Sequence, residues 1–183
     1  MDSKWEKKNS EEVVNSKWVK VTKDSVDLPN GTSIDDFYVI TIADAACIVA
    51  LDCDNNIILK REYRYCYDRD LIEIPAGAME ATESDPLACA KRELLEETGY
   101  ISSTDNWTYL GATIESSSKL TNYMHIYLAR DCVKVAEQNL DATEELDVIV
   151  MPLSEAVDMV CRNEICCNSS ANGILQAARI VGI

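Results

Sequence analysis

The segment from Asp85 to Gly99 constrains the fold most strongly, because it carries the start signal, the stop signal and the charge pattern of one short helix. Asp85 is a favoured residue at a helix N-cap, and Pro86 suits the first helical position. Gly99 directly follows Thr98, and glycine is typical of the residue after a helix C-terminus. We therefore predict a helix over residues 86–98.

Three glutamates crowd one face of this predicted helix. Glu96 and Glu97 stand three and four positions after Glu93, and residues at these spacings are neighbours on a helix surface. Adjacent carboxylates repel one another unless one is protonated or a cation lies among them. Hard oxygen ligands suit Mg²⁺ or Mn²⁺. The cluster therefore indicates a metal site, and the alternative is a solvated helix face that pairs with Lys91 and Arg92.

The acidic composition limits the classes of partner. The chain has 183 residues, of which 17 are basic and 32 acidic, so its net charge is -15. Such a chain repels nucleic acid and anionic membranes, and its sequence contains no apolar run long enough to span a bilayer. The length suits one domain over residues 16–183, and the polar residues 1–15 are predicted to be a flexible N-terminus.

The eight cysteines are scattered through the chain and form no C-x-x-C pair. With His125 as the single histidine, a zinc site is not indicated, and His125 itself is interpreted as a packed or surface residue. We expect a reduced, cytoplasmic protein with buried thiols.

The hydrophobic pattern predicts a mixed α/β fold. Two helices are expected after the first, one from Ser154, as its cap, to about residue 162 and one over about residues 171–180. An Asn-Gly turn is expected at residues 27–31. Such a pattern suits an α/β sandwich with a mixed sheet and a helix on each face. Strands are predicted over residues 17–21, 37–42, 46–51, 57–59, 71–74, 107–114, 123–128 and 148–151.

Residues 77–100, with the sequence GAMEATESDPLACAKRELLEETGY, resemble the signature of the Nudix hydrolases. The resemblance implies a Nudix-type α/β/α sandwich in which the helix over residues 86–98 is the central catalytic helix. One residue is inserted before Arg92 relative to the family pattern. Either Glu83 or Ser84 therefore fills the glutamate position that, in the family, anchors the loop to this arginine.

The resemblance also implies a chemistry for this helix. Glu93, Glu96 and Glu97 would bind Mg²⁺ or Mn²⁺, with Arg92 as a further catalytic residue. The main-chain carbonyl groups of Ala76 and Gly77 would add metal ligands, because glycine lets the main chain approach the metal closely. The implied reaction is hydrolysis of a phosphoanhydride.

Residues 57–64 and 71–77 resemble the ADP-ribose pyrophosphatase branch, although Glu62 replaces the usual glutamine and residues 116–120 depart from a usual Ser-Pro-Gly turn. This resemblance implies cleavage of ADP-ribose to AMP and ribose 5-phosphate. The alternatives are another nucleoside diphosphate sugar, a dinucleotide, a damaged nucleoside triphosphate, or a non-catalytic sensor of an NAD-derived ligand.

Two residues near the signature have alternative roles in substrate binding. Arg64 either contacts the diphosphate or pairs with Asp68 or Asp70 at the surface. Glu73 either hydrogen-bonds the nucleoside of the substrate or orients the main chain of the loop.

Residues distant from the signature complete the expected site. Glu144 or Glu145 either assists the attacking water from a late loop or belongs to a solvated acidic loop. Trp18 either covers the adenine of the substrate across a dimer interface or packs in the core. Relatives of this branch imply a homodimer that exchanges N-terminal strands within residues 17–43.

Overall fold

The computed structural model describes residues 3–183, which divide into two compact units. The first unit contains residues 3–43 and 114–123, and the second contains residues 44–113 and 124–183. This division differs from the expected single domain over residues 16–183, because the N-terminal strands pair with one another in a sheet of their own.

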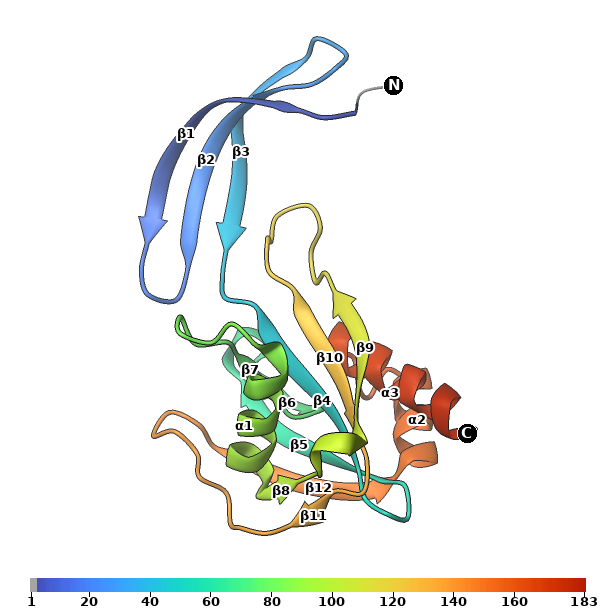
Figure 1. Ribbon diagram of the computed structural model, residues 1–183. Helices are drawn as coiled ribbons and strands as arrows, with labels where there is room; N and C mark the ends of the chain where they lie inside the picture. Colours follow the sequence, from blue (N-terminus) through green and yellow to red (C-terminus); the bar gives the residue numbers. More distant parts are fainter. Residues whose placement is uncertain (1–2) are drawn as a thin grey trace. The chain divides into compact units, whose positions relative to one another are not determined.

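The first unit is a three-stranded antiparallel sheet of β1 (Glu6–Asn15), β2 (Lys20–Asp27) and β3 (Ser33–Thr41), in that order (Figure 1). The turn predicted before β3 is present, with Gly31 at a φ of 83°. The expectation of a flexible segment over residues 1–15 is wrong for residues 6–15, and residues 1–2 lie outside the described part of the chain. Strand β1 pairs with β2 through its main chain although its polar sequence gives no apolar alternation.

The second unit is built on a seven-stranded mixed sheet with the order β12-β5-β4-β10-β9, in which β6 also pairs with β5 and β7 with β4. Strands β4 and β10 are parallel, and the other pairs are antiparallel. Strands β8 (Tyr100–Ile101) and β11 (Val133–Lys134) form a separate two-stranded sheet. The seven strands are β4 (Ala45–Leu51), β5 (Asn56–Arg64), β6 (Arg69–Glu73), β7 (Ala76–Ala78), β9 (Trp107–Thr113), β10 (Met124–Ala129) and β12 (Leu146–Pro152).

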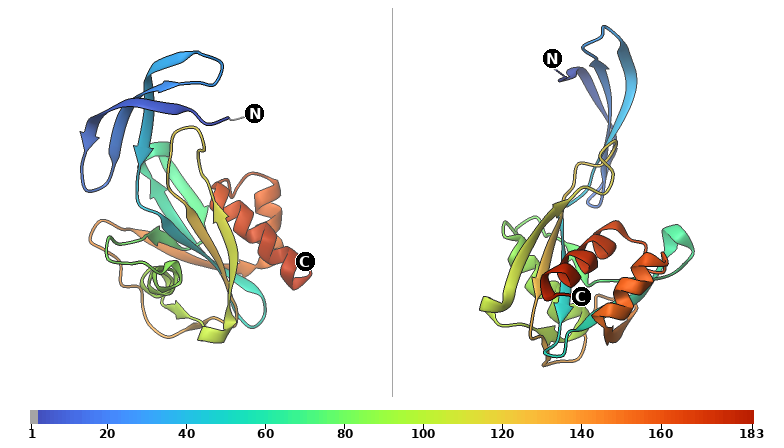
Figure 2. Two further views of the ribbon diagram at one scale, coloured as in Figure 1. Left: turned by 45° about the horizontal axis from the view of Figure 1, so that its top comes forward. Right: turned by 90° about the vertical axis from the view of Figure 1, so that its right-hand side faces the viewer.

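Helices cover both faces of this sheet, with α1 (Pro86–Thr98) on one face and α2 (Leu153–Cys161) and α3 (Asn168–Val181) on the other (Figure 1 and Figure 2). Strand β4 is buried throughout, so its alternate side chains feed two cores. Val49 packs with α2 and α3, whereas Ile48 packs with Leu94 of α1. The predicted α/β/α sandwich is confirmed for this unit.

The predicted limits of helix α1 are confirmed at both ends. The Asp85 carboxylate accepts a hydrogen bond of 3.0 Å from the main-chain N–H of Leu87, and Gly99 ends the helix with a φ of 74°. Helix α2 begins at Leu153, so Ser154 is not its cap, and α3 begins three residues before the expected Ala171. Short 3₁₀ turns occupy Tyr65–Tyr67 and Thr104–Asn106. Within residues 3–183, no helix has the length and apolar character needed to cross a bilayer.

Candidate active site

Strand β7 brings its main chain against the acidic face of α1. A Cβ atom placed on Gly77 would overlap the carboxyl group of Glu93, so a larger residue here would force the end of the Glu93 side chain to move. The Ala76 N–H donates a hydrogen bond of 3.0 Å to Glu97 Oε2. The structure therefore brings the main chain of Ala76 and Gly77 beside two of the predicted glutamates.

Arg92 connects the loop before α1 to the acidic face of the helix. Its guanidinium donates two hydrogen bonds of 3.1 Å to the two carboxylate oxygens of Glu83. It also donates to Glu93 at 2.7 Å and to Glu96 at 3.0 Å. Glu83, rather than Ser84, is therefore the acidic partner of Arg92, and this bond holds the pKa of Glu83 below its ordinary value. The inserted residue is accommodated before the helix without loss of the pair.

Two of the three glutamates are buried rather than solvated. Only 8% of the surface of Glu93 is exposed, and only 2% of that of Glu97. Burial raises the pKa of Glu97 to about 7, although Lys60 opposes the shift. Burial also raises the pKa of Glu93, against the attraction of Arg92 and together with the negative charges of Glu96 and Glu144. The site therefore holds carboxylates that are short of positive charge.

Lys60 is a buried residue beside the acidic face of α1 that the sequence analysis did not single out. Its ammonium group forms an ion pair with Glu97, lies 3.1 Å from Glu62 Oε2 and 3.4 Å from the carbonyl oxygen of Ala76. Burial lowers the pKa of Lys60, but Glu97 and then Glu62 raise it, and the net shift is upward. The sequence carries only a weak signal, because Lys60 directly follows the buried residues 57–59 but is itself the first residue of a polar stretch.

The residues around α1 fit a divalent cation in their chemistry. Three carboxylates and the carbonyl group of Ala76 offer oxygen ligands, as Mg²⁺ and Mn²⁺ prefer. Within residues 3–183, however, no three metal-binding side chains already converge on one point. The reason is that Arg92 and Lys60 each draw glutamate carboxylates toward themselves. A cation would bind after these pairs rearrange.

Arg64 and Glu73 pair with each other on strands β5 and β6. The Arg64 guanidinium donates to Glu73 Oε2 from Nε at 2.8 Å and from a terminal nitrogen at 2.5 Å, and to Glu62 at 2.9 Å. Its partners are thus not Asp68 or Asp70. The second oxygen of Glu73 accepts a hydrogen bond from the Cys167 thiol, so Glu73 does not orient the loop main chain. Burial, reinforced by Glu73, raises the pKa of Cys167 to about 12.

The late acidic loop is fastened to the end of α1. Gln138 donates a hydrogen bond of 2.8 Å to the carbonyl oxygen of Glu97, and the Asn139 N–H donates one of 2.8 Å to that of Glu96. Within this loop, Glu144 lies near enough to Glu93 for its charge to raise the pKa of Glu93.

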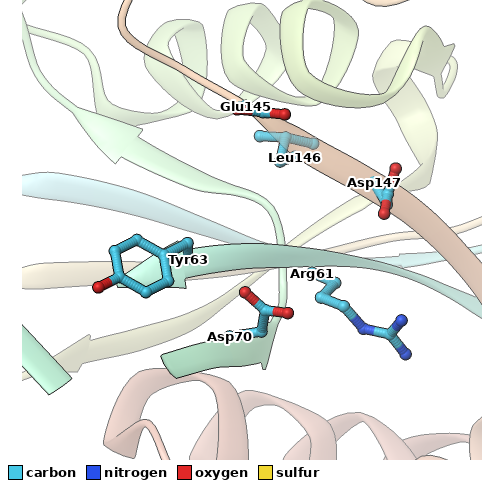
Figure 3. Close-up of a pocket in the computed structure, with 6 residues that line it drawn as sticks. All are labelled: Arg61, Tyr63, Asp70, Glu145, Leu146 and Asp147. Atoms are coloured by element: carbon cyan, nitrogen blue, oxygen red, sulfur yellow. The ribbon is translucent and has the colours of Figure 1, made fainter. Parts of the chain in front are cut away.

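Glu145 instead lines a polar cavity of about 310 Å³ (Figure 3). Arg61 and Tyr63 of β5 and Asp70 of β6 also line this cavity. Because side chains alternate along a strand, Arg61 and Tyr63 leave β5 on the face opposite to Lys60. The two neighbouring glutamates of the loop therefore have different surroundings. The remaining lining residues are Leu146 and Asp147.

Trp18 and His125 differ in their surroundings. Trp18 is 74% exposed, so it does not pack in a core, and Lys17 lies over its ring. His125 is half-buried, contacts the Tyr109 hydroxyl at 3.1 Å and approaches Asp44 at 3.9 Å. The interpretation of His125 as a packed residue is consistent with these contacts.

Comparison with protein families supports the assignment that the signature implied. Residues 41–164 match the NUDIX domain, and residues 5–40 match the nucleoside diphosphate sugar hydrolase N-terminal domain. The boundary between the two matches falls near residue 43, where the first unit of the structure gives way to the second.

Individual relatives cover most of the chain. A methanol dehydrogenase activator of Bacillus methanolicus is 32% identical over 82% of this chain and 80% of its own length. An ADP-ribose pyrophosphatase of Mycobacterium tuberculosis is 32% identical over 84% of this chain and 73% of its own length. An ADP-ribose pyrophosphatase of Bacillus subtilis is 29% identical over 85% of this chain and 82% of its own length. A crystal structure of an ADP compounds hydrolase shares the fold, with a TM-score of 0.82 and 21% identity over 98% of this chain and 95% of that one. The resemblance to the ADP-ribose pyrophosphatase branch is confirmed.

The pair formed by Glu83 and Arg92 should contribute measurably to stability. Substituting Glu83→Gln removes the charge of the carboxylate that binds the guanidinium, and we expect the free energy of unfolding to fall by about 1–2 kcal/mol. The matched Ser84→Ala variant should remain within about 0.5 kcal/mol of the unsubstituted protein. Urea denaturation measures both, and equal losses in the two variants would contradict the assignment of Glu83.

The raised pKa of Glu97 predicts a pH dependence of stability in the presence of EDTA. The pKa is 4.5 in an ordinary environment and about 7 in the fold, so the folded state holds this proton more tightly. The resulting stabilisation is complete below pH 4.5 and is lost as the pH rises to about 7, by up to about 3 kcal/mol. Denaturation at a series of pH values should show a smaller decline in the Glu97→Gln variant. Identical pH profiles would refute the prediction.

Proposed function

The chain belongs to the Nudix family of pyrophosphatase hydrolases, and we propose that it hydrolyses the diphosphate of a nucleoside diphosphate sugar, with ADP-ribose as the first candidate. Water would attack one phosphorus and break the phosphoanhydride bond, which gives AMP and ribose 5-phosphate. The observation that carries the proposal is the acidic face of α1 against the Gly77 loop, where buried carboxylates meet the main chain of Ala76 and Gly77.

Metal dependence is part of this proposal. Glu93, Glu96 and Glu97, with the carbonyl groups of Ala76 and Gly77, would hold Mg²⁺ or Mn²⁺. When bound, the cation supplies positive charge against the diphosphate. Burial supports this role, because charge–charge attraction is stronger where water is excluded.

Glu144 is the better candidate than Glu145 for taking a proton from the attacking water. Its charge acts on Glu93, and the loop that carries it is tied to the end of α1 through Gln138. The Glu144 carboxylate also accepts a hydrogen bond from the Asp141 N–H at 3.1 Å, which fixes its position in the loop. Glu145 contributes instead to the cavity with Arg61.

Arg64, Glu73 and Trp18 are proposed to bind the substrate. The side chain of Arg64 is 36% exposed, so a diphosphate can reach its guanidinium, although Glu62 and Glu73 already occupy part of it. Glu73 would then position Arg64 rather than contact the nucleoside. The exposed indole of Trp18, contributed by the second copy of a dimer, would supply a flat apolar surface suited to an adenine ring.

We also propose that the protein is a homodimer. In the first unit, the buried residues of strands β1 to β3 are Asp24 and Val26, and every residue of β1 is exposed. A three-stranded sheet with so small a core is marginal without a further apolar surface. A second copy of the chain would provide that surface for exposed side chains such as Trp5 and Val14. All eight cysteines are free, which supports a reducing, cytoplasmic compartment, although only Cys47, Cys89 and Cys132 are buried as expected.

The substrate assignment can be tested with a panel of nucleotides. Purified protein with ADP-ribose and Mg²⁺ should release AMP, whereas a triphosphate substrate would release pyrophosphate. Glu97→Gln and Glu144→Gln should each lower kcat by about 10²–10⁴-fold, and Glu145→Gln should stay within about threefold. Chromatography of the products measures these rates. No AMP from ADP-ribose with either metal would remove this substrate, and no turnover of any nucleotide would favour a sensor.

The dimer predicts a mass in solution and a role for Trp18. Light scattering should give twice the chain mass of 20.4 kDa. Replacing Trp18 by Ala should raise KM for ADP-ribose while leaving kcat and the dimer mass unchanged, because it removes a surface that binds the base. Replacing the exposed Tyr65 by Ala is a matched loss of an aromatic side chain outside the first unit. A monomeric mass would refute the dimer.

A further inference from the structure

Lys60 lies where a metal ion would compete with it. The lysine is 2% exposed and contacts the carboxylates of Glu97 and Glu62 and the carbonyl oxygen of Ala76. Glu97 and Ala76 are two of the groups that would hold Mg²⁺ or Mn²⁺. A single ammonium group is therefore in direct contact with part of the proposed ligand set before any metal arrives.

The burial of Lys60 indicates that this contact is built into the fold. An ammonium group loses its hydration when it is buried, and the loss is offset only by close partners of opposite charge. Lys60 has two such partners, one from helix α1 and one from its own strand β5. In return, its positive charge compensates part of the buried negative charge of Glu97. The pair thus links helix α1 to strand β5.

A divalent cation on the same oxygens would meet this ammonium at short range. Charges repel strongly in a buried site, because little water or salt screens them. The cation and Lys60 would also share the lone pairs of Glu97 and Ala76, since Lys60 already takes one from each. Both effects oppose binding of a metal to the site when no substrate is present.

We propose that Lys60 is a resident counter-cation of the active site, which stabilises Glu97 and the Ala76 loop in the metal-free protein and weakens metal binding to the substrate-free protein. This inference rests on the proposed metal dependence. The negative charge of a bound diphosphate would offset the excess positive charge, so metal and substrate should strengthen each other's binding. Lys60 is in this sense a positioning residue that couples the two ligands.

The test measures Mn²⁺ binding to the substrate-free protein by electron paramagnetic resonance. Lys60→Gln keeps donors for hydrogen bonds to Glu97 and Ala76 but removes the charge, and it should bind Mn²⁺ at least tenfold more tightly. Lys134→Gln is the matched control, because it changes the net charge equally at a lysine whose side chain is 48% exposed and paired with Glu137. Its Kd should stay within twofold of that of the unsubstituted protein.

Thermal unfolding gives a second readout. In EDTA, Lys60→Gln should melt at a lower temperature than the unsubstituted protein. Addition of Mn²⁺ should raise the Tm of Lys60→Gln by more than it raises the Tm of the unsubstituted protein. Should Lys60→Gln not fold in EDTA, refolding is titrated with Mn²⁺. Recovery of the folded state at Mn²⁺ concentrations below the Kd of the unsubstituted protein supports the inference. No recovery of the folded state overturns it.

The outcomes separate this inference from the function on which it rests. Equal or weaker Mn²⁺ binding by Lys60→Gln, with normal binding by the unsubstituted protein, overturns the role of Lys60 alone. Absence of Mn²⁺ binding in every variant, including the unsubstituted protein, overturns the proposed metal dependence as well. Loss of binding in Glu97→Gln establishes that the measured ion occupies this site.

Discussion

The burial of negative charge on α1 is the constraint on which the site depends. Glu93 and Glu97 lie under the surface beside the main chain of β7, where ionised carboxylates are costly unless cations accompany them. Arg92 and Lys60 supply that charge from the helix and from the sheet. The buried lysine at the end of the apolar stretch of β5 is explained by this requirement.

The charges of the site form one connected series along β5. Lys60, Glu62 and Arg64 project from the same face of the strand and alternate in sign. Lys60 joins the series to α1, and Arg64 joins it to Glu73 and thence to the Cys167 thiol at the start of α3. A diphosphate that reached the exposed part of Arg64 would therefore meet an array in which Lys60 and Arg64 already pair with the three carboxylates of Glu62, Glu73 and Glu97.

The two units differ in how much of their stability their own core can provide. The second unit buries apolar side chains on both faces of its sheet, and strands β4, β5 and β10 contribute to both cores. In the first unit, strand β1 is exposed along its whole length. Its sequence, EKKNSEEVVN, shows no apolar alternation. Its pairing with β2 therefore could not be predicted from a hydrophobic pattern.

The sequence by itself determined the features that depend on neighbouring residues. The cap at Asp85, the stop at Gly99 and the spacing of the three glutamates fixed helix α1 and its acidic face, because helix geometry repeats over a few positions. Only the tertiary structure decided that Glu83 rather than Ser84 holds Arg92, and that Lys60 reaches Glu97. These contacts join residues far apart in the chain or on a loop of variable length, and their energy depends on burial, which no local pattern specifies.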